Sequence, residues 1–316
     1  MKVLVTGGAG FIGSNLCEYL LSNNYEVVCL DNFSTGKIEN IHHLLNTYPN
    51  TFKLIVGDIR NLADCQKALN RVDYVMHEAA LGSVPRSIKD PITTNAVNIG
   101  GFLNMLIAAR DAKVKRFIYA ASSSTYGDSK ELPKVEDIIG KPLSPYAITK
   151  YVDELYADIF ARTYGLEYIG LRYFNVFGRR QDPFGAYAAV IPLFVKKMMA
   201  HERPIINGDG EISRDFTYID DVTSAITAVL EQDIDKNYSI YNVGSSNPHS
   251  VITLLHTIEH KLGIKANYIS SKALEGDVKY TCASTDLIRK NYTLPPATNF
   301  SEGISLFCKW IKEYLF

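Results

Sequence analysis

Short apolar segments alternate with longer amphipathic segments along the first two-thirds of the chain. The short segments are apolar at nearly every position, which predicts strands buried on both faces of a sheet. The longer segments carry apolar residues three and four positions apart, which predicts helices. This alternation predicts an α/β fold with a doubly wound parallel sheet. The expected strands are Val3–Thr6, Glu26–Leu30, Phe52–Val56, Tyr74–His77, Arg116–Ala120 and Tyr168–Arg172, and the clearest helices are Ile12–Ser22, Thr94–Ala112 and Tyr146–Tyr164.

The rhythm changes after about Asn175. Proline, glycine and aspartate become frequent, as in residues 181–185 and 207–210, and the strand and helix patterns become less regular. We expect residues 1–174 to form the doubly wound domain and residues 175–316 to form a smaller α/β lobe. No long polar linker or repeat is visible between them, so the two parts are expected to be interleaved.

Composition argues against several functional classes. The chain has 47% hydrophobic and 21% charged residues, as ordinary globular proteins do, and its net charge of −1 argues against binding to nucleic acid or to a membrane surface. No apolar stretch approaches the ~20 residues of a membrane helix, and the chain opens on a strand that leaves no room for a signal peptide. Five scattered cysteines without a C-x-x-C pair predict neither a disulfide framework nor a metal site, which fits a reducing cytoplasm.

Three glycines follow the first expected strand at a regular spacing. Gly7, Gly10 and Gly13 form a G-x-x-G-x-x-G turn that runs directly into a helix. Such a turn lets backbone N–H groups approach a pyrophosphate and lets the helix pack close to the sheet. An ordinary glycine turn is the alternative, but the order of strand, turn and helix favours a dinucleotide-binding Rossmann domain.

The second expected strand runs into Asp31, which lies 18 residues after Gly13. A carboxylate at this place can accept both ribose hydroxyls of an adenosine and repels a 2′-phosphate, so NAD is favoured over NADP. The alternative is a turn residue before Asn32. Residues 57–59 after the third strand are placed to meet the adenine, and residues 79–81 after the fourth are placed on the path toward the nicotinamide.

The candidate chemical groups follow the fifth strand and open the next helix. Ser122, Ser123 and Ser124 come at the carboxyl end of the strand, and Tyr146 and Lys150 lie one helical turn apart. A tyrosine hydroxyl is a poor base at neutral pH, but a neighbouring ammonium stabilises its phenolate. The arrangement predicts an oxidoreductase centre in which Tyr146 removes a hydroxyl proton while a serine hydroxyl binds the same oxygen.

With these motifs, the chain resembles the extended short-chain dehydrogenase/reductase family, and within it the NAD-dependent nucleotide-sugar epimerases and dehydratases. The shared segments also include Arg172–Gly178, Arg214–Phe216 and residues 275–278. The resemblance implies a Rossmann domain, a nucleotide-sugar lobe, and an NAD that stays bound and is regenerated in each turnover. It implies the cofactor residues Gly7, Gly10, Phe11, Ile12, Gly13, Asp31, Asn32, Ser34, Thr35, Gly36, Asp58, Ile59, Ala79, Ala80, Leu81, Asn98, Tyr146, Lys150 and Tyr173.

Within that family the residues beside the catalytic serine or threonine separate the reactions. Dehydratases resemble Thr-Asp-Glu at this place and decarboxylases Thr-Ser-Glu, because their reactions need a further acid or base. Here the serine run carries no carboxylate, which favours 4-epimerisation. The resemblance assigns the catalytic hydroxyl to Ser122, with Ser123 as the neighbour that could share the role.

The resemblance also points to the sugar. Residues 82–87 and 178–183 are similar to those of bacterial UDP-N-acetylglucosamine 4-epimerases, and the position that gates the 2-acetamido group holds the small Thr281. This favours interconversion of UDP-GlcNAc and UDP-GalNAc, with UDP-glucose/UDP-galactose or UDP-hexosaminuronates as alternatives; Thr281 could instead only pack against the lobe. The implied substrate residues are Ser83, Arg86, Ser122, Asn175, Gln181, Ala189, Val190, Asn207, Arg214, Asp277 and Thr281.

Three points stay open from the sequence. Many relatives carry an arginine where this chain has Leu274, so either Arg214 alone or a nearby lysine, Lys272 or Lys279, would meet the diphosphate. A dehydratase or reductase, or a non-catalytic NAD-binding scaffold, is a competing function. The family also implies a homodimer through a four-helix bundle of Thr94–Ala112 and Tyr146–Tyr164, although these helices could simply cover the sheet.

Overall fold

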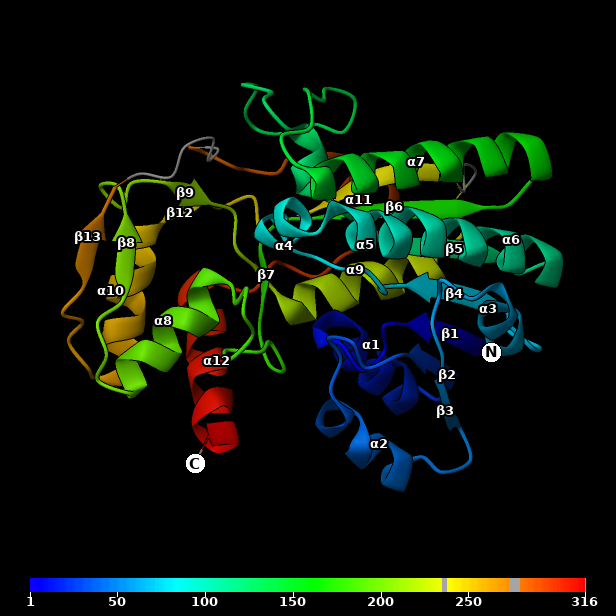
Figure 1. Ribbon diagram of the computed structural model, residues 1–316, viewed down its shortest axis with the longest axis horizontal. Coiled ribbons are helices and arrows are strands. Elements are labelled where there is room, and N and C mark those ends of the chain that lie inside the picture. The colour runs from blue at the N-terminus through cyan, green and yellow to red at the C-terminus, as the bar shows by residue number, and fades with distance from the viewer. Residues whose placement is uncertain (235–237, 273–278, 316) are drawn as a thin grey trace.

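A seven-stranded parallel sheet forms the centre of the computed structural model, which describes residues 1–234, 238–272 and 279–315 (Figure 1). The strand order is β11-β6-β5-β4-β1-β2-β3, and every neighbouring pair is parallel. The predicted doubly wound sheet is therefore confirmed. Its strands are β1 (Lys2–Thr6), β2 (Glu26–Asp31), β3 (Phe52–Val56), β4 (Tyr74–His77), β5 (Arg116–Ser122), β6 (Tyr168–Tyr173) and β11 (Tyr238–Val243).

The seventh strand, β11, comes from the second part of the chain. It pairs with β6 from Tyr238↔Tyr168 to Val243↔Tyr173 and forms one edge of the sheet. This strand is not among the expected ones, because the strand and helix patterns after about Asn175 are less regular. Residues 1–174 and 175–316 therefore share one sheet.

Both faces of the sheet are buried, because successive strand residues point to opposite sides. Val3 and Val5 pack into one apolar core with helices α1 (Phe11–Ser22) and α9 (Ile219–Glu231). Leu4, between them, packs into a second core on the other face. There the covering helices are α3 (Leu62–Ala68), α6 (Phe102–Ala112) and α7 (Pro145–Tyr164).

The expected helix Thr94–Ala112 is longer and less regular than predicted. It consists of α5 (Pro91–Asn95), a π-helical turn (Ala96–Gly101) and α6. The expectation that no stretch has the length and apolarity of a membrane span is corrected, because the run Pro91–Ala112 has a mean hydropathy of 1.3 over 18 residues. Its apolar residues Phe102, Met105 and Leu106 are buried against the sheet. Length and composition alone do not distinguish this sheet-covering helix from a membrane span.

Most other elements of the second part form a further group, and β8, β9, β12, β13, α8, α10 and α12 are seen on the left of Figure 1. It contains three two-stranded sheets, in which β7 pairs with β10, β9 with β12 and β8 with β13. The strands are β7 (Val176–Phe177), β8 (Ile205–Asn207), β9 (Ser213–Arg214), β10 (Thr217–Tyr218), β12 (His249–Ser250) and β13 (Ile269–Ser271), and the helices are α8 (Val190–Met199), α10 (Val251–Leu262) and α12 (Phe300–Leu315).

Shorter elements lie in the connections. Two of them, α4 and the 3₁₀ turn η3, pack against α7 and so adjoin the predicted catalytic helix. The connecting elements are the 3₁₀ turn η1 (Ile38–Asn40), α2 (His42–Thr47), α4 (Val84–Lys89), η3 (Ser123–Tyr126) and α11 (Asp286–Asn291).

Candidate active site

The glycine turn after β1 has the geometry that the sequence predicts. Gly7 has a φ of +66°, which favours glycine, and the N–H of Gly10 donates to the Gly7 carbonyl over 2.9 Å. A Cβ atom added at Gly13 would lie 2.2 Å from that same carbonyl oxygen. The first turn of α1 can therefore approach β1 this closely only because residue 13 lacks a side chain.

Asp31, the last residue of β2, is buried beside this turn. Its carboxylate accepts the N–H of Ala9 over 2.9 Å and the N–H of Phe33 over 2.8 Å. Burial raises the pKa of Asp31, and these backbone hydrogen bonds oppose the rise. A Cβ atom at Gly36 would lie 2.9 Å from both carboxylate oxygens, so glycine at 36 leaves room beside Asp31.

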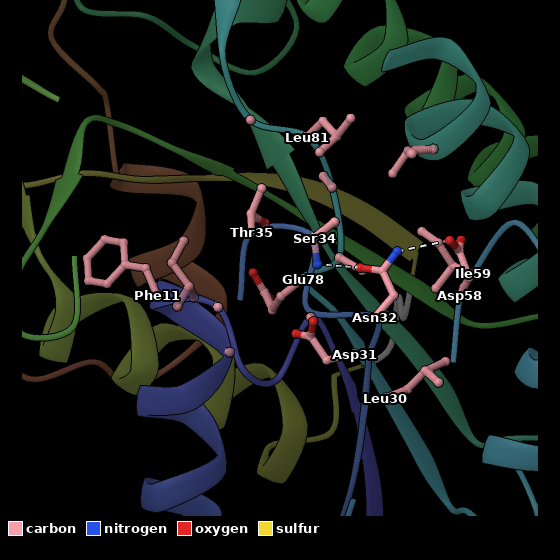
Figure 2. Close-up of a pocket in the computed structure, with 18 of the residues that line it drawn as sticks. Phe11, Leu30, Asp31, Asn32, Ser34, Thr35, Asp58, Ile59, Glu78 and Leu81 are labelled. Carbon is pink, nitrogen blue, oxygen red and sulfur yellow. Dashed lines mark hydrogen bonds between the residues drawn. The ribbon is translucent and has the colours of Figure 1, made fainter. Parts of the chain in front are cut away.

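These residues border a cavity of about 250 Å³ (Figure 2). Asn32 connects two sides of it, because its amide donates to Asp58 over 2.9 Å and its carbonyl accepts the N–H of Ser34 over 3.0 Å. Most of the cofactor residues expected from the sequence line the cavity, namely Gly7, Gly10, Phe11, Ile12, Gly13, Asp31, Asn32, Ser34, Thr35, Asp58, Ile59, Ala79, Ala80 and Leu81. The glycine turn leaves space that a Cβ atom would occupy, and the buried carboxylate of Asp31 lies beside it. Both features fit a bound NAD at this place.

Some lining residues are not singled out by the sequence. Leu30 and Val97 are apolar and resemble ordinary core residues, whereas Glu78 is a carboxylic acid that directly follows β4. Its place at the carboxyl end of a strand was a signal that could have identified it. The expected cofactor residues Gly36, Asn98, Tyr146, Lys150 and Tyr173 lie outside this lining.

Asn98 instead connects the cavity to the helix of the predicted catalytic pair. Its side-chain carbonyl accepts the N–H of Leu81 over 2.8 Å, and its amide donates to the hydroxyl of Thr149 over 3.0 Å. Asn98 sits in the π-helical turn, and Thr149 is the residue before Lys150 on α7. This buried amide therefore holds α7 in place relative to the cavity wall.

Helix α7 carries Tyr146 in its first turn and Lys150 one turn later. The Ser144 hydroxyl accepts the N–H of Ala147 and caps the helix, and Pro145 occupies its first position. The buried Lys150 ammonium donates to the Ala120 carbonyl of β5 over 2.9 Å and to Asp153 over 3.3 Å. The backbone N–H of Tyr146 donates to the Ser87 hydroxyl of α4. Hydrogen bonds thus hold Tyr146 to α4 and Lys150 to β5.

The serine run forms a tight turn at the end of β5. The hydroxyl of Ser122 accepts from the backbone N–H of Ser124 over 3.1 Å and from its hydroxyl over 2.8 Å. Ser122 is buried, whereas Ser123 and Ser124 are partly exposed. The turn packs against α7, so this run adjoins the helix of Tyr146 and Lys150.

Buried ionisable groups lie around Lys150. Burial raises the pKa of Asp153 to about 7, and the Lys150 charge opposes this rise. Burial, aided by the same charge, lowers the pKa of His77 to about 3, so its imidazole is neutral at neutral pH. His77 forms a 2.9 Å hydrogen bond with the Thr6 hydroxyl between β4 and β1.

A second cavity of about 270 Å³ lies in the second part of the chain. Six expected substrate residues line it, namely Asn175, Gln181, Ala189, Val190, Asn207 and Arg214. The remaining lining is apolar and looks like core in the sequence: Val176, Phe177, Ile191, Phe194, Ile205, Ile212, Phe216 and Val251. Binding sites for a ring-containing ligand with an anionic group commonly combine an apolar wall with a few polar side chains and an arginine.

The other expected substrate residues are placed differently. Ser83, Arg86 and Thr281 are not among the residues that line the second cavity. Ser83 caps α4 by accepting the N–H of Arg86, whose guanidinium lies 5.3 Å from the ring centre of Tyr187. Asp277 and Leu274 lie outside the described residues.

Thr281 adjoins the strand of Arg214. Its N–H donates to the Ser213 carbonyl over 3.2 Å, and its hydroxyl accepts the N–H of Asp215 over 3.3 Å. Asp215 is fully buried, and its carboxylate accepts the N–H groups of Ser245 and Ala283, each over 2.8 Å. Asp215 therefore holds three chain segments together beside the second cavity.

All five cysteines are free, and four of them are buried. No group of three histidine, cysteine, aspartate or glutamate residues that could hold a metal occurs in the described parts of the chain.

Comparisons with known proteins agree with this geometry. Residues 3–244 match the sequence model of the NAD dependent epimerase/dehydratase family. The Thermotoga maritima UDP-glucose 4-epimerase with UDP-glucose has a TM-score of 0.93 at 33% identity, covering 100% of both chains. The UDP-N-acetylglucosamine 4-epimerase of Methanobrevibacter ruminantium in complex with UDP-N-acetylmuramic acid has a TM-score of 0.92 at 36% identity, covering 99% of this chain and 98% of the other.

A third similar structure contains the cofactor. It is the UDP-glucuronic acid 4-epimerase of Bacillus cereus in complex with UDP-glucuronic acid and NAD, with a TM-score of 0.92 at 33% identity, covering 99% of this chain and 100% of the other. With a family match over three-quarters of its length, the chain belongs to the NAD-dependent epimerase/dehydratase family, and NAD is its cofactor.

Proposed function

We propose that this protein is a UDP-sugar 4-epimerase that interconverts UDP-GlcNAc and UDP-GalNAc. The observation that carries the reaction type is the serine turn at the end of β5, which adjoins the Tyr146/Lys150 helix and holds no carboxylate. Elimination of water needs an additional acid and base, whereas epimerisation at C4 needs only one proton-transfer group. The names of similar proteins include 4-epimerases of three UDP-sugars, which supports the reaction type and leaves the sugar to be determined.

In this proposal three side chains act on the sugar. Tyr146 removes the proton of the 4-hydroxyl, and the Ser122 hydroxyl donates a hydrogen bond to the same oxygen. The Lys150 ammonium, held by Ala120 and Asp153, stabilises the phenolate of Tyr146. When bound, NAD supplies reversible oxidation and reduction at C4. The 4-keto sugar rotates within the site, so that its other face is reduced. Tyr146 then returns the proton to the 4-oxygen of the epimer.

The second cavity is the proposed place of the nucleotide. Arg214 would pair with the diphosphate, Asn175 and Gln181 would donate amide hydrogen bonds, and the apolar wall would take the uracil ring. Asp277 would help close the nucleotide pocket. Lys272 or Lys279 is a further candidate to pair with the diphosphate, in place of the arginine that many relatives carry where this chain has Leu274. Ser83 and Arg86 on α4 would bound the sugar, because α4 packs against the helix of Tyr146.

The choice of an N-acetylated sugar rests on Thr281. Its short side chain lies beside Ser213 and Asp215, next to the strand that carries Arg214 into the second cavity. A small residue here leaves room for a 2-acetamido group, and a tyrosine would fill that room. UDP-glucose and UDP-hexosaminuronates are the competing substrates.

The experiment is a panel of UDP-sugars incubated with the purified protein without added NAD, followed by NMR of the products. UDP-GlcNAc should give UDP-GalNAc with the largest kcat/KM of the panel. Faster turnover of UDP-glucose or of a uronate would replace the proposed sugar and leave the reaction type intact. Accumulation of a 4-keto sugar would identify a dehydratase. No turnover of any member, with NAD bound, would favour a non-catalytic scaffold.

We further propose that two chains associate through α5, α6 and α7. Apolar side chains are exposed along this surface: Ile92 is 82% exposed, and Ile148, Leu155 and Ile159 on α7 are 50%, 52% and 43% exposed. Leu155 and Ile159 lie one turn apart, as an interface stripe on a helix requires. Paired with the same surface of a second chain, these helices would form a four-helix bundle.

Two broader assignments accompany this proposal. Residues 1–174 would serve mainly the cofactor and residues 175–316 mainly the nucleotide sugar, because the first cavity is lined by residues 7–97 and the second by residues 175–251. A cytoplasmic location would suit the free cysteines and a UDP-sugar substrate.

A further inference from the structure

Glu78 is an ionisable residue of the cofactor cavity to which the family motifs assign no role. It directly follows β4, and its backbone N–H donates to the Thr6 carbonyl of β1 over 3.2 Å, which fixes it between the two central strands. Its side chain lines the cavity, where Figure 2 shows it among the other lining residues. A carboxyl group is thus built into the wall that faces the cofactor.

The two oxygens of this carboxyl group have different surroundings. Oε1 accepts the hydroxyl of Tyr173 over 2.9 Å. Oε2 is buried and has no hydrogen-bond partner among the residues that the structure describes. A buried carboxyl oxygen without a partner carries a desolvation cost, which a bound ligand can remove. Tyr173 therefore holds one oxygen of a carboxyl group that lines the cavity, and the hydrogen-bonding capacity of the other oxygen is unused.

The strand order places this carboxyl group toward the redox half of the cofactor. Asp31, at the end of β2, marks the adenosine side, and Glu78 lies beyond β1 at the end of β4. Its partner Tyr173 ends β6 and pairs in register with Ser122, the last residue of β5. The Lys150 charge also acts on Glu78. Glu78 is therefore on the side of Ser122 and Lys150, where the nicotinamide must meet the sugar.

We propose that Glu78 contacts the nicotinamide half of bound NAD and that its negative charge makes this cofactor harder to reduce. The oxidised ring carries a positive charge, and uptake of two electrons and one proton by the ring removes it. A carboxylate beside the ring attracts the oxidised form and not the reduced form, so the equilibrium moves toward the oxidised form. Tyr173 is a positioning residue that holds the carboxylate there and stabilises its charge.

This inference requires only that NAD binds, not that the sugar is the one proposed above. Burial raises the pKa of Glu78 to about 7 in the cofactor-free protein, and the positive ring favours the ionised form. In an epimerase the carboxylate would keep the resting cofactor in the form that starts the reaction. The test therefore uses no sugar, so that its failure is distinct from a failure of the proposed function.

The test measures the reduction of bound NAD by mediator-coupled titration at about pH 8, where the carboxyl is ionised. The near-ultraviolet absorbance of the reduced ring reports the ratio of oxidised to reduced cofactor. Glu78→Gln keeps the size of the side chain and removes its charge. It should lower this ratio at least tenfold at a fixed potential, which is about 30 mV for a two-electron couple. Glu39→Gln, which removes an exposed carboxylate on η1, is the matched control and should change nothing.

Tyr173→Phe tests the positioning role and provides a second route if Glu78→Gln fails to retain NAD. It keeps the carboxyl group but removes the donated hydrogen bond, so the ratio should fall in the same direction by a smaller factor. An unchanged ratio in Glu78→Gln overturns the proposal, whatever happens to its turnover of sugars. A lower ratio in Glu39→Gln as well would show a general effect of charge and would also overturn it.

Discussion

Arg172 and Glu154 join β6 to α7 through two parallel hydrogen bonds of 2.8 Å, with both side chains buried. The guanidinium also donates to the Glu136 carbonyl and lies 4.8 Å from the ring centre of Tyr126. Arg172, a residue of the shared segment Arg172–Gly178, thus fixes the helix of Tyr146 and Lys150 against the sheet. Both buried charges therefore have hydrogen-bond partners.

Removal of one partner of this pair should be costly. Glu154→Ala would leave the Arg172 charge buried without its carboxylate, and we expect the free energy of unfolding to fall by about 3–5 kcal/mol. Asp158→Ala, which breaks the exposed pair with Arg162 on the same helix, should cost less than about 0.5 kcal/mol. Denaturant unfolding of both variants measures the difference. Equal losses would mean that the buried pair contributes no more than a surface pair.

Tyr146→Phe should remove turnover while leaving the cofactor in place. Without the phenol, the sugar hydroxyl loses its proton acceptor, and kcat should fall by about 10²–10⁴-fold. Tyr151→Phe, on the same helix, is the matched control and should keep full activity. The measurement is kcat on the best UDP-sugar of the panel, together with the NAD content of each variant. Retained turnover in Tyr146→Phe would refute its role as the base.

Thr281→Tyr should exclude N-acetylated sugars. The larger side chain would occupy the space of the acetamido group, and kcat/KM for UDP-GlcNAc should fall by about 10–200-fold while that for UDP-glucose changes little. The substitution also alters the hydroxyl that accepts the N–H of Asp215. Thr281→Val controls for this loss, because it removes the hydroxyl at nearly constant volume. An equal fall of kcat/KM for UDP-GlcNAc and UDP-glucose would mean that Thr281 only packs against the lobe and does not select the sugar.

A charge on the exposed face of α7 should prevent the proposed dimer. Leu155→Arg places a charge in the middle of the apolar stripe, and light scattering should then give the mass of one chain instead of two. Leu306→Arg, at a similarly exposed leucine of α12, should leave the mass unchanged. If the unaltered protein already has the mass of one chain, the four-helix bundle is wrong.

The stability of the cofactor-free protein should depend on pH through Glu78. Its pKa is about 7 in the folded protein against an ordinary value of 4.5, so the folded protein keeps a proton that the unfolded chain releases between these values. The stabilising effect is therefore present at low pH and is lost as pH rises toward 7, by about 2–3 kcal/mol. Glu78→Gln has no proton to lose, so it should gain stability relative to the unaltered protein between pH 5 and pH 8. A difference that does not change with pH would show that the pKa of Glu78 is the same in the folded and unfolded chains.

Much of the first cavity could be predicted from the sequence, because a glycine turn and a strand-end carboxylate are local features. The close approach of α1 to β1 depends on Gly7 and Gly13, and the carboxylate of Asp31 accepts a backbone N–H of the same turn. The spacing of these residues in the sequence is enough to recognise them. Glu78 follows a strand end in the sequence, and that place could have marked it as a site residue, but the burial of its carboxyl group arises only in the assembled sheet.

The second cavity was harder to predict for a related reason. Arg214 and Asn175 stand out as polar motif residues, but most of the wall consists of apolar side chains from separate short elements. Asp215 belongs to the shared segment Arg214–Phe216, but only the structure shows that its carboxylate accepts N–H groups of two distant segments. Contacts between segments far apart in the chain leave no local pattern.

The position of β11 at the edge of the central sheet has a consequence for how the protein is made. The first six strands of the central sheet leave the ribosome well before β11 (Tyr238–Val243) is made. Until then the backbone of β6 has no strand to pair with on that side. The nascent chain should therefore show resistance to protease over the whole sheet only after residue 243 has left the exit tunnel. A chain stopped at residue 174 would present an unpaired β6 edge and would be expected to aggregate rather than fold as an independent cofactor domain.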